Sequence, residues 1–281
     1  MNDMFTLKSI MKEDTKIVAF VGTSKNGTSF IVNHLAQIYA NKGINTAILD
    51  MTSNRNSFFI YTRNDDNLRS IAENTMDNLN KGTAEGIKVK KNLTVYTSVP
   101  DQSNDGIDPE SILTTLVKNH SLILIDCDFA TDLSYYIGSH ELCLVLSMDV
   151  LTLQQITKYL YEIKKSVDLD VNRIRIILNK NIRLKSATSE SIIMGVSNYN
   201  DPRMRYMGPI FDASIVKVNK ISFSEEVYVK YLDGLITCNI STSSYPNKIV
   251  KEIEELANAI YTNNSKKTFL DPIKFFGNSN N

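Results

Sequence analysis

The chain has 281 residues, of which 42% are hydrophobic and 22% are charged, a balance typical of a folded protein with a buried core. Lys and Arg number 31, as do Asp and Glu, so the composition gives no general attraction to nucleic acid or anionic lipid. The three cysteines and three histidines are scattered and show no metal-ligand spacing, and an odd number of cysteines argues against a disulfide framework. We interpret all six as structural.

No segment of the sequence predicts export or a membrane span. Residues 1–16 lack an apolar core of the length that a secretory signal needs. No apolar run approaches the roughly 20 residues of a transmembrane helix. We therefore expect a reducing, cytoplasmic location.

Short apolar runs alternate with segments of helical periodicity from residue 16 onward. In chain order, the first half predicts a strand at 16–21, a helix from Ile31 to the stop at Lys42-Gly43, a strand at 46–49, a helix at 67–81, a strand at 93–97 and a helix that opens at Asp108-Pro109. The second half predicts strands at 122–125 and 142–146, a helix at 152–167, a strand at 174–178 and an amphipathic helix at 247–261.

The order of these elements defines the expected fold class. Apolar strands without strict alternation, separated by helices, indicate an α/β protein whose mostly parallel sheet is covered by helices on both faces. No linker interrupts the pattern, so we expect an N-terminal extension at 1–15, one domain at 16–263 and a tail at 264–281. The segment 183–245 is the least legible, because several strands and short helices fit it.

The segment between the first strand and the first helix has the spacing of a phosphate-binding loop. Residues 22–29 (GTSKNGTS) fit G-x-x-x-x-G, with glycines that let backbone amides turn toward an anion at a helix N-terminus. Ser29 stands where a hydroxyl normally ligates magnesium, but Thr28 stands where a lysine normally precedes it. The lost charge costs on the order of a few kcal/mol of transition-state stabilisation. A plain strand-to-helix turn is the alternative.

Four segments, KIVAFVGTSKNGTSF, AILD ending at Asp50, LILID ending at Asp126 and ILNK ending at Lys180, fall in the order seen in the ParA/MinD superfamily of P-loop ATPases. The chain resembles that superfamily over residues 16 to 261. The resemblance implies that Asp50 positions the attacking water, that Asp126 and Ser29 lie at Mg²⁺, and that Asn179 contacts adenine. The implied cofactors are ATP or ADP with Mg²⁺, and the implied nucleotide loop comprises Gly22, Thr23, Ser24, Lys25, Asn26, Gly27, Thr28, Ser29 and Phe30.

The loop departs from the family pattern at a second position. The family carries an early lysine that reaches across an ATP-bridged dimer, and here that position is Thr23. Lys25 is either a substitute cation or a solvated loop lysine. The tripeptide Gly27-Thr28-Ser29 is similar to the pilus-assembly branch, the CpaE/TadZ proteins, in which a small residue replaces the loop lysine. Without these charges, hydrolysis is expected to be weak or absent, and Asp50 and Asp126 have the alternative role of capping turns.

The tail carries a short motif of its own. Its apolar residues fall on one helical face and are flanked by lysines: Phe269, Leu270, Ile273 and Phe276. Such a segment either lies in a membrane interface, as the resemblance to the MinD tail implies, or docks on the protein itself or on a partner. Pro272 shortens any helix here.

Three functions remain open at this point. The first is a nucleotide-responsive, dimeric positioning or assembly factor that recruits a partner machine such as a pilus or secretion apparatus. The others are a slow ATPase in DNA partition or conjugation, and a scaffold that binds partners without nucleotide. A protein partner is expected in each case, and the neutral net charge does not indicate nucleic acid.

Overall fold

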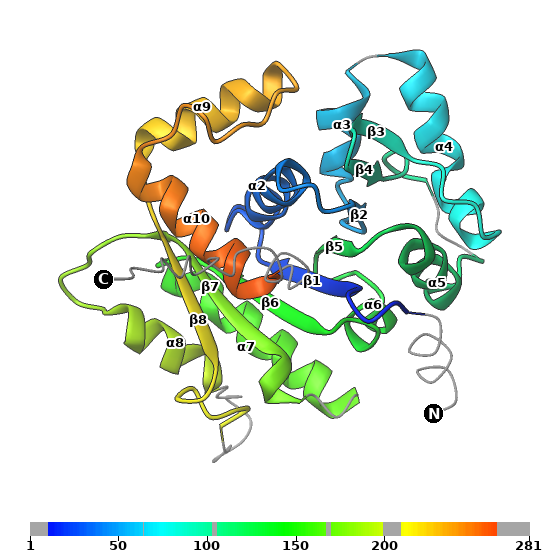
Figure 1. Cartoon of the computed structure of the whole chain (residues 1–281). Coiled ribbons are helices and arrows are strands. Elements are labelled where there is room, and N and C mark those ends of the chain that lie inside the picture. Colours follow the sequence, from blue (N-terminus) through cyan, green and yellow to red (C-terminus); the bar gives the residue numbers. More distant parts are fainter. Residues whose placement is uncertain (1–10, 64, 103–105, 167–169, 199–208, 263–281) are drawn as a thin grey trace, which may run out of the picture.

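The computed structural model describes residues 11–63, 65–102, 106–166, 170–198 and 209–262 (Figure 1). Within these residues, eight strands form one sheet in the order β3-β4-β2-β5-β1-β6-β7-β8, and every pair except β3 with β4 is parallel. The strands are β1 (Lys16–Gly22), β2 (Thr46–Asp50), β3 (Ile87–Lys90), β4 (Leu93–Tyr96), β5 (Leu122–Cys127), β6 (Glu141–Leu146), β7 (Ile174–Asn181) and β8 (Lys217–Ser222).

Helices cover both faces of this sheet, as predicted. Alternate residues of β1 enter two separate cores, with Ile17 and Ala19 in one and Val18 and Phe20 in the other. The core of Ile17 includes side chains of α5 (Pro109–Asn119), α7 (Val150–Ser166) and α8 (Ser189–Ser197), whereas that of Val18 includes α2 (Thr28–Asn41) and α10 (Asn247–Ile260). The other described helices are α3 (Asn56–Thr62), α4 (Asp66–Asn80), α6 (Leu133–Ile137), η1 (Val171–Arg173) and α9 (Glu225–Ile236).

Several helix boundaries follow from local sequence signals. The Asp108 side chain accepts hydrogen bonds from the amides of Glu110 and Ser111, which explains why α5 begins at Pro109. Asp65 caps α4 in the same way. The prediction missed the short elements α3, β3 and α6, and placed the start of α7 two residues late. The segment 183–245 contains α8, β8 and α9; β8 is mostly polar because it is an edge strand.

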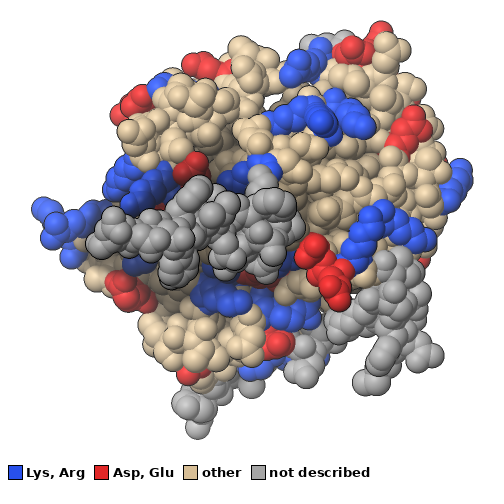
Figure 2. Space-filling view, viewed as in Figure 1, with Lys and Arg blue, Asp and Glu red and all other residues tan. Residues whose placement is uncertain are grey.

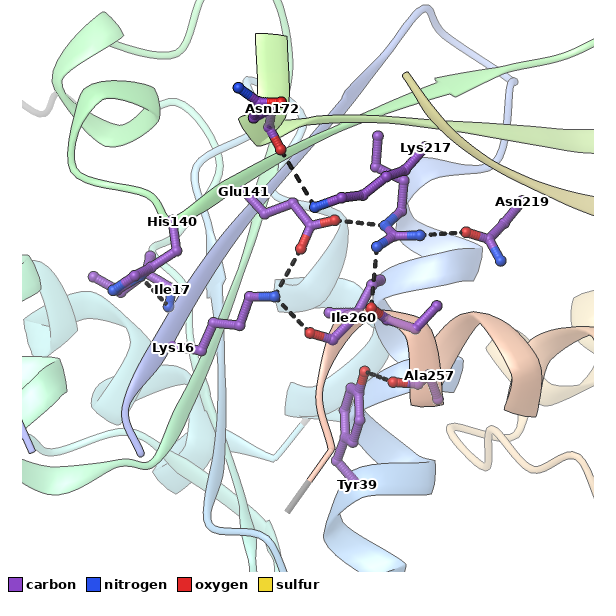
Figure 3. Close-up of polar contacts among 12 residues, drawn as sticks. Lys16, Ile17, Tyr39, His140, Glu141, Asn172, Lys217, Asn219, Ala257 and Ile260 are labelled. Atoms are coloured by element: carbon purple, nitrogen blue, oxygen red, sulfur yellow. Dashed lines mark hydrogen bonds and ion pairs between the residues drawn. The ribbon is translucent and has the colours of Figure 1, made fainter. Parts of the chain in front are cut away.

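A cluster of ion pairs fixes the C-terminal end of α10 beneath the amino-terminal ends of β1 and β6 (Figure 3). Glu141 is 3% exposed and pairs with Lys16 Nζ at 2.7 Å and with Arg175 Nε at 2.5 Å. The same two cations donate to the last carbonyls of the helix, Lys16 to Ile260 and Arg175 to Ala259. Cations at this position also interact favourably with the helix dipole. The cluster therefore joins the C-terminal end of α10 to β1, β6 and β7.

The carboxyl ends of the central strands carry the polar residues of interest. Gly22 ends β1 and leads into the loop before α2, while Asp50 ends β2 and pairs in register with Asp126 on β5. Asn179 lies near the end of β7. In open parallel sheets this edge is where ligands bind. The domain boundaries proposed from the sequence stay a prediction.

Candidate functional site

The loop between β1 and α2 has a shape that its two glycines permit. A Cβ at Gly22 would lie 2.6 Å from the carbonyl oxygen of Val145, so a side chain does not fit there. Gly27 has φ +90° and caps α2, and a Cβ on it would lie 2.3 Å from Nδ2 of Asn179. Lys25 also has positive φ, at 68°. The loop therefore turns through the left-handed conformation that glycine adopts without strain.

Asn26 holds the loop against two neighbouring strands. Its side chain is 3% exposed, donates to the Val145 carbonyl at 3.4 Å and accepts from the Ser147 hydroxyl at 2.9 Å. Its backbone carbonyl accepts from Nδ2 of Asn179 at 2.8 Å. Because three parts of the chain meet at this residue, its hydrogen bonds hold the loop against β6 and β7.

A cavity of about 290 Å³ lies against the loop, and we call it the phosphate cavity. It is lined by Gly22, Thr23, Ser24, Lys25, Gly27, Thr28, Ser29, Phe30, Thr52, Asn54, Asn56, Asp126, Cys127, Asp128 and Tyr231. Two buried lining residues have oxygens without hydrogen-bond partners among the described residues: Oγ1 of Thr23 and both carboxylate oxygens of Asp126. Burying an oxygen without a hydrogen bond costs free energy, and a polar ligand in the cavity would supply the missing partners.

The carboxyl group of Asp126 has a strongly perturbed pKa. Burial raises its pKa well above the ordinary range, and the carboxylates of Asp50 and Asp128 raise it further. The Ser29 hydroxyl acts in the opposite direction. A cation placed in this cavity would favour the ionised carboxylate and relieve the repulsion.

The carboxylate of Asp50, unlike that of Asp126, has hydrogen-bond partners among the described residues. Its carboxylate accepts hydrogen bonds from the amide and hydroxyl of Thr52, at 3.0 and 2.7 Å, and from the amide of Ser57 at 2.7 Å. It is fully buried and does not line the phosphate cavity. This geometry favours a role in shaping the loop after β2 over the expected role in positioning a water molecule.

The oxygen atoms of the phosphate cavity fit Mg²⁺ better than a transition metal. Ser29 and Asp126 offer hydroxyl and carboxylate oxygens, the ligands that Mg²⁺ prefers, whereas both carboxylate oxygens of Asp128 already accept hydrogen bonds from backbone amides. In the described part of the chain, no group of three or more His, Cys, Asp or Glu side chains could hold a metal by itself. Mg²⁺ commonly uses one or two carboxylates together with waters and phosphate oxygens, so this donor set suffices.

A larger cavity, of about 420 Å³, adjoins the phosphate cavity, and we call it the base cavity. Most of its lining is apolar and comes from the end of β8, the start of α9 and Ile249 of α10. Asn179 lies at its wall, with one amide hydrogen already donated to Asn26. The side chains of Lys25 and Lys180 lie at its edge, and Lys180 Nζ donates to the Lys25 carbonyl.

The structure brings together most of the residues expected at the site. All of 22–30 except Asn26 line one cavity or both, Asp126 lies in the phosphate cavity, and Asn179 lies in the base cavity. The sequence analysis missed Asp128 and Tyr231. The D-x-D pattern at the end of β5 signals the first, and Ser224 followed by two glutamates signals the start of the helix that carries the second. The tail motif lies outside the described residues.

Comparison with solved structures identifies the fold. The ParA family ATPase of Chlorobium tepidum has a TM-score of 0.60 and 16% identity, covering 86% of this chain and 98% of that one. A putative plasmid partition protein of Borrelia burgdorferi bound to AMPPNP also has a TM-score of 0.60, with 14% identity and coverage of 86% and 98%. The MinC:MinD complex of Aquifex aeolicus has a TM-score of 0.60 and 13% identity, covering 86% of this chain and 96% of that one. No family model and no curated protein matches the sequence.

The protein is thus an α/β protein with the fold of the P-loop NTPases, as its loop and parallel sheet indicated. Within that class, its fold is that of the ParA/MinD ATPases, and this prediction from the motifs is confirmed. At identities of 13–16%, the likeness concerns the fold. The pilus-assembly branch stays a prediction.

Proposed function

We propose that this protein is a nucleotide-responsive positioning or assembly factor, which binds ATP or ADP with Mg²⁺, hydrolyses ATP slowly or not at all, and recruits a protein partner. The observation that carries the proposal is the phosphate cavity, where Asp126 and Thr23 present buried oxygens without partners beneath a preformed loop. A Mg²⁺-nucleotide would satisfy these groups: backbone amides of the loop toward the phosphates, and Ser29 and Asp126 toward the ion.

The chemistry of the cavity favours binding over rapid turnover. Thr23 and Thr28 line it where two lysines are expected, so two full charges are absent. The carboxylate of Asp50 is already occupied by Thr52 and Ser57. Bound Mg²⁺ would supply charge neutralisation at the phosphates. Lys25 lines both cavities and is the cation best placed to compensate for the lost lysines.

The base cavity is large and apolar enough for a purine. In this proposal Asn179 contributes its free carbonyl oxygen to the base, because one amide hydrogen holds the loop. The partner is proposed by analogy with MinD, which is found with MinC in the Aquifex aeolicus complex. Homodimerisation and membrane contact through the tail remain parts of the proposal. Among the described helices, none has both the length and the apolar composition of a membrane span.

DNA partition is a weaker alternative. The formal net charge is zero. On the face shown in Figure 2, Lys and Arg side chains lie in separate groups, with Asp and Glu among them. A protein that binds DNA without sequence preference usually carries one continuous basic surface.

Titration with a fluorescent ATP analogue tests the proposal. Gly27→Ala places a methyl group against Asn179 at a residue with φ +90°, whereas Gly82→Ala, at φ +89°, meets nothing within 4 Å. Both variants strain the backbone equally, so only Gly27→Ala should abolish saturable, Mg²⁺-dependent binding. No binding by the wild type at millimolar nucleotide, or equal binding by the two variants, would contradict the proposal. Phosphate release in the same samples separates binding from slow hydrolysis.

A further inference from the structure

Tyr231 of α9 lies where the cavities of the site meet. It lines the phosphate cavity, the base cavity and a third cavity of about 300 Å³ beside Ser29 and Asn56. Its ring meets the ring of Phe30 edge to face, with centroids 5.0 Å apart, and lies 5.6 Å from the ring of His34. Phe30 lines the same two principal cavities. The two rings therefore form part of the wall that the two cavities share, to which Lys25 and Gly27 also contribute.

This wall lies on the path of the proposed ligand. A nucleotide with its phosphates at the loop and its base in the larger cavity must pass through the boundary that the two cavities share. In the present arrangement, the contact between Phe30 and Tyr231 occupies that boundary. Neither cavity alone provides both a phosphate-binding loop and an apolar pocket.

Phe30 and Tyr231 differ in how firmly they are held. Phe30 belongs to the first turn of α2, most of whose residues are buried. The helix that carries Tyr231 buries only Val227 and Gly234 among its residues, and it lies at the outside of the molecule over α2 (Figure 1). Its other face exposes apolar side chains, including Val229 at 50% and Ile236 at 80%. Helices with few buried contacts move at low energetic cost.

The ends of α9 supply points about which it can turn. Ser224 caps its first turn through the Val227 amide. The preceding Ser222 is fixed by two hydrogen bonds to the carboxylate of Glu252 on α10. At the other end, the chain reverses at Cys238, which has φ 54°, and its carbonyl accepts from Arg63. The helix is thus held at both ends, and between them Lys230 donates to the Ser244 carbonyl.

We propose that Tyr231 is the gate of the nucleotide site: its ring, packed on Phe30, divides the base cavity from the phosphate cavity, and nucleotide binds only when α9 moves this ring aside. The inference rests on the proposed function and adds a regulatory step to it. A ligand that binds only the open form has an affinity reduced by the fraction of molecules that are open. A partner that engages the exposed face of α9 would change that fraction.

Tyr231→Ala tests the gate, with Tyr231→Phe as the matched control that keeps the ring and its contact with Phe30. Equilibrium titration and stopped-flow association with the fluorescent ATP analogue are measured for both variants and the wild type. If the open form makes up a tenth or less of the wild type, Tyr231→Ala should bind about tenfold or more tightly and associate faster. Tyr231→Phe should bind as the wild type does.

The outcomes separate the gate from the proposed function. Binding by the wild type with equal or weaker binding by Tyr231→Ala would overturn the gate and leave the proposed function standing. No binding by either protein would overturn the proposed function. Circular dichroism verifies folding, and if Tyr231→Ala does not fold, Tyr231→Leu removes the aromatic wall with a smaller loss of packing and is held to the same criterion.

Discussion

His34 links the loop helix α2 to the chain that precedes α10. Its Nδ1 lies 2.7 Å from the Phe30 carbonyl, which only accepts, so Nδ1 carries the proton. Its Nε2 then accepts from the Tyr245 hydroxyl at 2.9 Å. Burial lowers the pKa of His34 to about 4, and burial together with Lys88 lowers the pKa of His120 to about 4 as well. Both histidines are neutral in the folded protein at pH 7.

These depressed pKa values predict a loss of stability in mild acid. Between the ordinary histidine pKa of 6.5 and the folded value of about 4, the unfolded chain binds more protons than the folded one. The free energy of unfolding should therefore fall as the pH is lowered through this window, by up to about 3 kcal/mol for His34. Urea unfolding at pH 7.0, 6.0 and 5.0 measures how the free energy of unfolding changes with pH. His34→Gln should reduce the slope, because His34 no longer contributes and His120 remains; an unchanged slope would contradict the assignment.

At the scale of elements, the C-terminal end of α10 is held by charged side chains of β1, β6 and β7. Glu141 holds Lys16 and Arg175, which in turn donate to the last carbonyls of the helix. Removing the charge from Glu141 leaves two cations in a largely buried cluster without their counter-ion. Breaking a buried pair in this way typically costs 3–5 kcal/mol.

Glu141→Gln should accordingly lower the free energy of unfolding by about 3 kcal/mol. Glu190→Gln is the control, because Glu190 pairs with Lys220 on the surface, and its loss should produce no measurable change. Chemical denaturation of the two variants measures the difference. Equal effects would show that the cluster does not stabilise α10.

Elements with strong local signals could be predicted from the sequence, and those that depend on tertiary context could not. The apolar runs of β1, β5 and β6 are buried on both faces, and Asp108 with Pro109 marks the start of α5. The edge strand β8 buries only Ile221, and α6 has five residues, too few to show helical periodicity. The helix α9 buries only two residues.

The site residues also divide into those that local sequence predicts and those that depend on tertiary contacts. The loop 22–29 is contiguous in sequence, so its spacing alone places Gly22, Gly27 and Ser29. Turn capping by Asp50 was the alternative that the sequence left open, but its partners Thr52 and Ser57 could not be named, because only the path of the chain after β2 identifies them. The position of Tyr231 depends on how α9 crosses α2, which no local pattern encodes.

At the scale of the whole molecule, the phosphate cavity lowers the stability of the protein when no ligand is bound. Asp126 is fully buried, lacks hydrogen-bond partners among the described residues and lies near two further carboxylates. A carboxylate in that setting destabilises the empty protein, and ligand binding repays the cost. Ligand should therefore stabilise the wild type much more than Asp126→Asn.

The most direct test is the thermal unfolding of these two proteins, measured by calorimetry at pH 7.5 with and without millimolar Mg²⁺-ATP. Without ligand, Asp126→Asn should melt at a higher temperature than the wild type, because the raised pKa of the buried carboxyl costs stability at pH 7.5 and a neutral amide does not carry that cost. With ligand at about 100 times Kd, the wild type should gain about 2.7 kcal/mol and melt several degrees higher, while the variant should gain little. A wild type that Mg²⁺-ATP does not stabilise, or a variant stabilised equally, would contradict the central claim that this cavity binds Mg²⁺-nucleotide through Asp126.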